Sequence, residues 1–177
     1  MRADADKARI DRLLTELGKH GRGGDRIYVA GGTSAVEVGW REFTQDVDIR
    51  IESATDEPLL RAIASLKERL DVNVELASPL DFLPAPPNWA DRSPFIARFG
   101  AVDVYHVDFA LQALAKLERG LDRDLRDLAA MLDLKLTSRE AIRDTFESIE
   151  PELYRFPAID AEELRSLVQA FTALRGA

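Results

Sequence analysis

The chain contains 177 residues, of which 46% are hydrophobic and 32% are charged. This length fits one domain with a helical extension, and the composition allows both a buried core and a soluble surface. The formal net charge of −8 argues against a protein that coats nucleic acid or an anionic membrane, because either function requires a basic surface.

The sequence contains no cysteine and only two histidines. These counts exclude a disulfide scaffold, a thiol nucleophile and a cysteine-ligated zinc site, so any metal is expected to be held by oxygen atoms. The longest run without a charged residue spans the ten residues 27–36, too short to cross a membrane, and the N-terminus is too charged for a signal peptide. We therefore expect a cytoplasmic protein with no membrane partner.

Hydrophobic spacing predicts alternating helices and strands in the first part of the chain. Leu13, Leu14 and Leu17 recur at helical spacing within a helix over 4–17, and the sequence DVDIRIE alternates as a strand does. Five of the eight prolines fall within 78–95, which is expected to be a long ordered loop. The other expected elements are strands at 26–30, 46–52, 72–77 and 101–107, a short helix ending near 38 and a helix opening at 56.

The second part of the chain is predicted to be helical. Helices are expected over 109–119 and 122–135, and two more begin at Thr137, in a capping box with Glu140, and at Asp160, with Glu163 three residues on. The predicted fold class is α/β, with a small mixed sheet in residues 1–108. Residues 109–177 are expected to form a helical region packed on this core, as one compact unit.

The most informative residues are the acids of the strand at 46–52. Because successive side chains of a strand alternate, Asp46 and Asp48 are expected on one face while Val47 and Ile49 enter the core. Two carboxylates at this spacing repel each other unless a cation or water lies between them. Mg²⁺ is commonly bound by one or two carboxylates together with substrate phosphates, so the pair can serve phosphoryl transfer. A solvated pair at a sheet edge is the simpler alternative.

A Gly31-Gly32 turn lies between the first strand and the short helix. Glycines at such a point allow the backbone to approach a phosphate closely, with helix N–H groups directed at it. Thr33 and Ser34 follow, and their hydroxyls are expected either to cap the helix or to donate to the phosphate.

The order of these features resembles the signature of the nucleotidyltransferase superfamily. In both, a strand, a Gly-Gly turn and a short helix precede a strand with paired acids; here 13 residues separate Gly32 from Asp46. The spacing of Gly39, Arg41 and Thr44 relative to the acids is similar to that in AbiEii-type nucleotidyltransferases, toxins of bacterial toxin–antitoxin and abortive-infection systems. The likeness spans about residues 25 to 135.

This resemblance implies a polymerase-beta-like nucleotidyltransferase fold and a reaction. A nucleoside monophosphate would pass from an NTP to a hydroxyl, releasing pyrophosphate, with Mg²⁺ or Mn²⁺ as cofactor. The family points to RNA, especially a tRNA 3′ end, as acceptor and to a cognate antitoxin protein as partner. A small-molecule acceptor and a non-catalytic binding module on the same fold are the alternatives.

The resemblance also assigns a role to each matching acid. Asp46 and Asp48 would hold the metal, and a third carboxylate is expected on the strand after the next helix. Glu75 lies at that place, so it is our expected third ligand. Asp103 and Asp108 are its rivals.

The remaining assignments concern the nucleotide. The resemblance implies contacts from Gly31, Gly32, Thr33, Ser34, Arg41 and Thr44 in the first part of the chain. In the second part it implies that Lys116 and Arg119 (or Arg123) contact the triphosphate, and that Asp124 or Asp127 belongs to the active centre. The alternatives are a surface lysine at 116, a solvated ladder of Arg–Asp pairs in the following helix, and a surface ion pair of Arg41 with Glu42 or Glu37.

Several further residues are weighed as contacts of an RNA acceptor. Trp89 and Arg92 are expected either to stack on a base and bind a phosphate or, in the case of Trp89, to pin the proline-rich loop. His106 is expected to be packed in the core rather than to act as a base. RNA binding by this acidic chain requires a local basic strip, for which the candidates are Lys19, Arg22, Arg26, Arg92 and Arg98.

Overall fold

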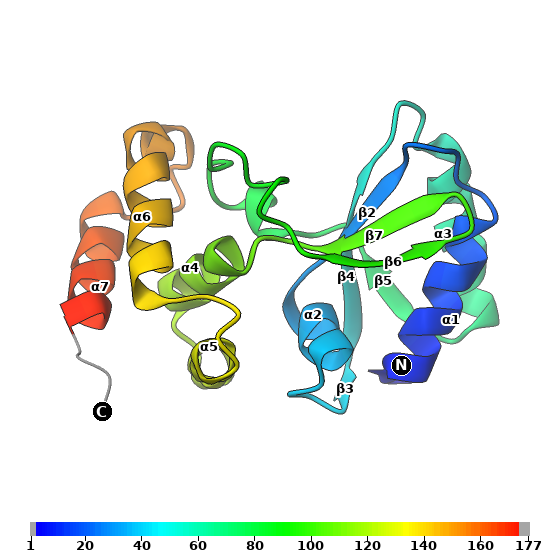
Figure 1. Cartoon of the computed structure of the whole chain (residues 1–177), viewed down its shortest axis with the longest axis horizontal. Coiled ribbons are helices and arrows are strands. Elements are labelled where there is room, and N and C mark those ends of the chain that lie inside the picture. The colour runs from blue at the N-terminus through cyan, green and yellow to red at the C-terminus, as the bar shows by residue number, and fades with distance from the viewer. Residues whose placement is uncertain (1–2, 174–177) are drawn as a thin grey trace. The chain divides into compact units, whose positions relative to one another are not determined.

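The computed structural model describes residues 3–173 of the chain (Figure 1). The described residues form two compact units. The first unit comprises the chain up to Ser78 together with Ser93–Val107, and the second comprises Pro79–Arg92 together with the chain from Asp108 onward. The proline-rich loop therefore groups largely with the helical unit. The proposed packing of the chain as a single compact unit stays a prediction.

The first unit contains a five-stranded mixed sheet. β4 (Asp46–Glu52) pairs antiparallel with β2 (Arg26–Val29) and parallel with β5 (Asn73–Glu75). β7 (Val102–His106) pairs parallel with β2 and antiparallel with β6 (Phe95–Phe99). A separate pair of short strands, β1 and β3, joins the N-terminal segment to the residues before β4. In order across the main sheet the strands are β5, β4, β2, β7 and β6; the short pair is β1 (Ala5–Asp6) and β3 (Phe43–Thr44).

Three helices complete this unit: α1 (Lys7–Gly18), α2 (Gly31–Val38) and α3 (Glu57–Arg69). The predicted stripe of α1 is buried, and it packs with α3 and with the apolar side chains of the sheet, including Val47 and Ile49. The other side chains of β2, β4 and β7 project from the opposite side of the sheet, which we call the polar face: Arg26, Tyr28, Asp46, Asp48, Arg50, Glu52, Asp103 and Tyr105.

The second unit is helical, as predicted. Its elements are the 3₁₀ turn η1 (Pro79–Asp81), the helices α4 (Phe109–Arg119), α5 (Asp122–Asp133), α6 (Arg139–Ile149) and α7 (Ala161–Ala173), and the 3₁₀ segment η2 (Glu150–Arg155). Buried apolar side chains from all four helices form its core, among them Leu114, Leu128, Phe146 and Leu164. The predicted α/β fold with a mixed sheet and a helical C-terminal half is thus confirmed. No helix of residues 3–173 is long and apolar enough to cross a bilayer.

Local details differ from the sequence prediction at a few points. β6 was not predicted, since the expected loop ended at its first residue, Phe95; the strand pairs with β7 around Gly100, whose φ of 58° permits the tight turn. Helix α6 is capped by Ser138, whose hydroxyl accepts the N–H of Ala141, rather than by Thr137. Asp160 does cap α7, since its carboxylate accepts the N–H groups of Glu162 and Glu163.

Candidate active site

The acids of β4 lie as the alternation predicts. Asp46 and Asp48 are half-buried on the polar face, whereas Val47 and Ile49 are fully buried. The strand is tied to the start of α2 at this point, because the N–H of Asp48 donates to the Thr33 hydroxyl at 2.8 Å and the N–H of Ala30 donates to the Asp48 carbonyl at 3.2 Å. The carboxylate pair is therefore held on a rigid element.

Gly31 brings the backbone against one of these carboxylates. Its φ is +56°, and a Cβ built on it would lie 2.6 Å from Oδ2 of Asp48. Both the backbone conformation and the space therefore require glycine. At Gly32 there is likewise no space for a side chain, because a Cβ would lie 2.2 Å from the Thr44 hydroxyl. The Gly-Gly turn thus lies directly beside the acid pair.

The hydroxyls next to the turn hold the backbone. Helix α2 begins after Ala30 without a side-chain cap, so the expected capping by Thr33 or Ser34 is wrong. Instead, Thr33 accepts the N–H of Asp48, and the Ser34 hydroxyl donates to the Val29 carbonyl at 3.1 Å. In the same way the Thr44 hydroxyl donates to the Asp46 carbonyl at 3.0 Å. Their role as phosphate contacts stays a prediction.

His106 is buried behind this region, as expected for a packed histidine. Its Nδ1 lies 3.0 Å from the Ser34 hydroxyl, and burial lowers the pKa of the imidazole to about 4. The ring is therefore neutral near pH 7, which suits a structural hydrogen bond between β7 and α2.

Strand β5 lies beside β4 and supplies polar side chains to the same face. Asn73 is the register partner of Asp46, and Glu75 is the partner of Asp48. The Asn73 amide donates to Asp46 Oδ1 at 2.5 Å and to Glu75 Oε1 at 3.4 Å. Asn73 was not predicted as a site residue, although its position two residues before Glu75 places it on the same face of the strand.

The oxygen ligands available at this site fit a hard cation that also binds the phosphates of a substrate. Asp46 and Asp48 provide the one or two carboxylates that Mg²⁺ commonly takes from a protein, with substrate phosphates supplying other ligands. Within residues 3–173, no three acidic or histidine side chains come together as a ready metal site. Glu75 lies on the neighbouring strand, with the Asn73 amide bonded to both it and Asp46, and its place as a third ligand stays a prediction.

Comparison with known protein families gives a match over almost the whole chain. A family described as a nucleotidyltransferase of unknown function (DUF6036) matches residues 8–172. The chain belongs to this nucleotidyltransferase family. No curated protein and no solved structure matches it. The match supports the superfamily indicated by the Gly-Gly turn and the paired acids, and it includes both units of the structure.

The two rival third acids of this nucleotidyltransferase have other partners. Asp103 lies on β7, separated from β4 by β2, and its carboxylate accepts two hydrogen bonds from Arg98, at 2.6 and 2.9 Å, that lower its pKa. Asp108 belongs to the second unit, where it caps α4 and bonds to Arg92 at 2.8 Å. Of the three acids, only Glu75 is on the strand next to the pair.

Arg41 lies beside the Gly-Gly turn, because a Cβ on Gly32 would be 3.6 Å from Arg41 Nη1. Its expected alternative partner Glu37 is bound instead by Lys7 at 2.5 Å, and burial raises the pKa of Glu37. The location of Arg41 is therefore compatible with a phosphate contact, which stays a prediction.

The second unit of the nucleotidyltransferase contains an ion cluster, which we define as Lys116, Arg119, Asp124 and Asp127; all but Arg119 are buried. Lys116 is only 5% exposed and bonds to Asp127 at 2.5 Å and to Asp124 at 3.3 Å, while Arg119 binds Asp124 through two nitrogens. Burial acts to raise the pKa of Asp124, but the hydrogen bond from Arg119 and the charge of Lys116 outweigh it and lower the pKa.

This cluster corrects two alternatives from the sequence. Lys116 is not a surface lysine, and Asp124 and Asp127 are buried rather than part of a solvated ladder. The i, i+3 spacing of the two acids places them on one helix face, where they meet Lys116 from α4. Two acids and two bases balance each other within this cluster.

Proposed function

We propose that this protein transfers a nucleoside monophosphate from an NTP to a hydroxyl of an acceptor, with Mg²⁺ or Mn²⁺ as cofactor. The observation that carries the proposal is the contact between the Gly-Gly turn and the paired acids of β4, in a chain that matches a nucleotidyltransferase family. Asp46 and Asp48 are the residues that would hold the metal. When bound there, the metal would neutralise the triphosphate and lower the pKa of the attacking hydroxyl.

The other residues of the site are assigned separate roles in the transfer. The Asn73 amide orients Asp46, and the absence of a side chain at Gly31 lets the backbone lie against the Asp48 carboxylate. In the transfer, the acceptor oxygen forms a bond to the α-phosphorus while the bond from that phosphorus to the bridging oxygen breaks, and pyrophosphate leaves. Glu75, on the strand next to the pair, is proposed to accept the hydroxyl proton, and Arg41 to contact the phosphates.

The resemblance to AbiEii-type enzymes supports finer proposals. On this basis the acceptor is RNA, especially a tRNA 3′ end, and the biological role is that of a toxin with a cognate antitoxin. The same resemblance assigns the triphosphate contacts of the second unit to Lys116 and Arg119. Because Lys116 already bonds to two carboxylates, such a contact would require a phosphate oxygen to replace one of them or to share the ammonium group.

The direct test incubates the purified chain with each α-labelled NTP, Mg²⁺ and total RNA. The proposal predicts that label appears on RNA, that a chelator abolishes the transfer, and that Asp48→Asn abolishes it without unfolding the chain. Label on a small molecule would redirect the proposal to that acceptor class. Absence of both transfer and NTP binding would overturn it in favour of a non-catalytic module.

A further inference from the structure

The polar face carries a row of aromatic rings on the strands beyond the acid pair. Tyr28 and Tyr105 stack with ring centroids 5.4 Å apart, and Phe95 meets Tyr105 edge to face at 5.3 Å. Exposure changes from 0% at Tyr28 to 57% at Phe95. We call these three residues the aromatic row. It begins in the sheet and ends in a ring that offers its surface to solvent.

A β-bulge places Phe95 on this face. In the β6–β7 hairpin, Phe95 is opposite Tyr105 but Ala97 is opposite Val104, so Ile96 is an extra residue between the two pairs. Without it, alternation would put Phe95 on the core side with Ala97. The bulge thus directs a large apolar ring away from the core, which costs burial. Such bulges often re-aim side chains near functional sites.

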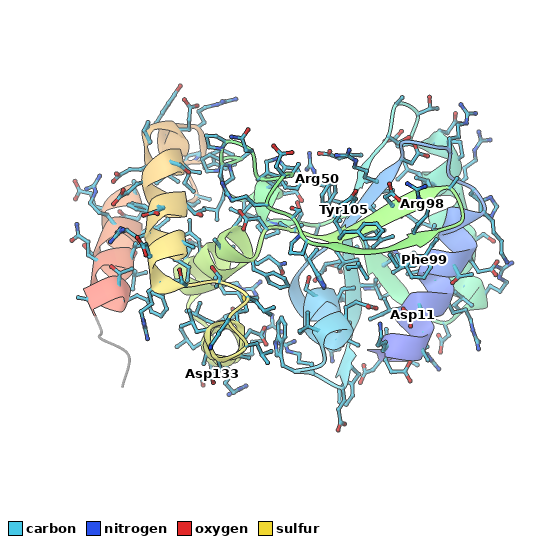
Figure 2. The ribbon with its side chains drawn as sticks, in the orientation of Figure 1. Asp11, Arg50, Arg98, Phe99, Tyr105 and Asp133 are labelled. Atoms are coloured by element: carbon cyan, nitrogen blue, oxygen red, sulfur yellow. The ribbon has the colours of Figure 1, made fainter. Side chains whose placement is uncertain are left out.

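Arginines flank the aromatic row. The guanidinium of Arg26 lies 5.8 Å from the centroid of the Tyr105 ring, and Figure 2 labels Tyr105 and Arg98 on the β6–β7 hairpin. Arg50 bonds to Glu52 at 3.5 Å, and Arg98 bonds to Asp103 at 2.6 Å. These three arginines, with Glu52 and Asp103, form a patch of net charge +1 around the aromatic row, within a chain whose net charge is −8. Its aromatic surface and small positive charge suit a ligand that has a flat aromatic ring and few phosphate groups.

We infer that the aromatic row stacks an unpaired base of an oligonucleotide acceptor whose end reaches the acids of β4. The inference rests on the proposed nucleotidyl transfer. Phe95 is on the third strand from β4, about 14 Å away at ordinary strand spacing. In a single nucleotide, the distance from the base to the α-phosphorus is shorter than the distance from β4 to Phe95. An NTP with its phosphates beside Asp48 therefore does not place its own base on Phe95, whereas a neighbouring nucleotide of an acceptor strand reaches it.

The test measures binding of a short fluorescent single-stranded RNA to the full chain without NTP, so that catalysis is not involved. Phe95→Ala should weaken binding about fivefold or more, because stacking on an aromatic ring contributes substantially per base. Phe95→Trp should preserve binding, while Phe95→Leu, which keeps apolar surface without a ring, should not. Phe82→Ala is the matched control, since Phe82 is 65% exposed in the other unit and should leave binding unchanged.

Two further measurements separate stacking from charge. An RNA with abasic sites should bind the wild-type chain as weakly as intact RNA binds Phe95→Ala. Affinity should depend little on salt: the slope of log association constant against log salt concentration should be about −0.7, as expected when one single-strand phosphate is neutralised. A steep slope, or equal affinity for intact and abasic RNA, would assign binding to phosphates and overturn the inference.

The outcomes also distinguish this inference from the proposed function. Asp48→Asn should abolish transfer but leave RNA binding unchanged. If RNA binds through Phe95 and no transfer occurs, the proposed function fails and the stacking site stands. If transfer to RNA occurs and Phe95→Ala changes neither RNA binding nor transfer, or lowers only NTP affinity, the stacking site is wrong.

Discussion

Two pairs of acids in this chain have different surroundings. Asp46 and Asp48 are half-buried on a strand face, next to a turn whose glycine backbone lies against Asp48. Asp124 and Asp127 are fully buried in the helical unit and bond to Lys116. Buried charges require matched partners, whereas half-exposed acids can bind a ligand cation. Similar acid spacings in the sequence therefore correspond to a half-exposed pair in one unit, proposed to hold a cation, and to a self-balanced cluster in the other.

The largest expected effect tests the buried cluster. Lys116→Met keeps the apolar stem but leaves two buried acids without their shared cation, so the free energy of unfolding should fall by about 3–5 kcal/mol. Chemical denaturation followed by circular dichroism measures this loss. Lys19→Met, at an exposed ion pair, is the control and should cost less than about 1 kcal/mol. A loss at Lys116 as small as in the control would contradict the structural role.

The second prediction concerns pH and the neutral histidine behind the Gly-Gly turn. Since burial lowers the pKa of His106 from 6.5 to about 4, the unfolded chain binds more protons between these values. The stability contributed by the neutral ring is therefore complete above pH 6.5 and is lost as pH falls toward 4. The shift corresponds to about 3 kcal/mol.

The measurement compares unfolding of the wild-type chain and His106→Asn at several pH values. The variant should have a flatter profile between pH 6.5 and 4, since it lacks this titration. The Asp124 contribution has the same sign but lies at lower pH, because its pKa is lowered from 3.8, so its stability is present above that value and is lost at more acidic pH. Identical profiles for the variant and the wild type above pH 4 would contradict the assignment to His106.

The third prediction concerns the acids of β4. Asp46→Asn or Asp48→Asn should lower nucleotidyl transfer at least roughly 100-fold, equivalent to about 2.7 kcal/mol in the barrier, because each removes a main electrostatic element. Neither should unfold the chain, since both side chains are half-exposed. Asp71→Asn is the matched control, because Asp71 is exposed and asparagine tolerates its φ of 52°. Near-full activity in either β4 variant would mean that the site is wrong.

The smallest expected effect tests the fit of the turn against Asp48. Gly31→Ala should destabilise the chain by about 1–2 kcal/mol from its positive φ alone, with an added cost from the contact with the Asp48 carboxylate. Gly23→Ala is the control, because nothing lies within 4 Å of its added Cβ. Thermal unfolding of both variants checks the difference. If the two variants are equally stable, the close approach of Gly31 is not required.

The sequence predicted most elements because their signals are local. Helical spacing located α1 and α4, and alternation located β4 together with the face of its two acids. Strand β6 was missed for two reasons. Prolines dominate the segment before it, and the bulge within β6 interrupts the alternation of its side chains at Ile96. The pattern of two strand-like runs around Gly100 was the signal that could have found the hairpin.

The site was less predictable where it depends on tertiary pairing. The parallel register of β5 with β4 brings Asn73 to Asp46, and no local pattern specifies that register. The burial of Lys116 likewise requires α5 to pack on α4, so sequence alone left it between a surface lysine and a phosphate contact. The family match agrees with the short motif of turn and acids, which is set by spacing along the chain.

The most direct test of the central claim is metal binding by the acids of β4. Electron paramagnetic resonance of Mn²⁺ added to the full chain with an NTP should show bound metal in the wild type and in Asp71→Asn. The bound signal should be lost in Asp46→Asn and Asp48→Asn at the same concentrations, because Mn²⁺ prefers carboxylate and phosphate oxygens. Equal Mn²⁺ binding by the wild type and both β4 variants would contradict the assignment of the metal to these acids.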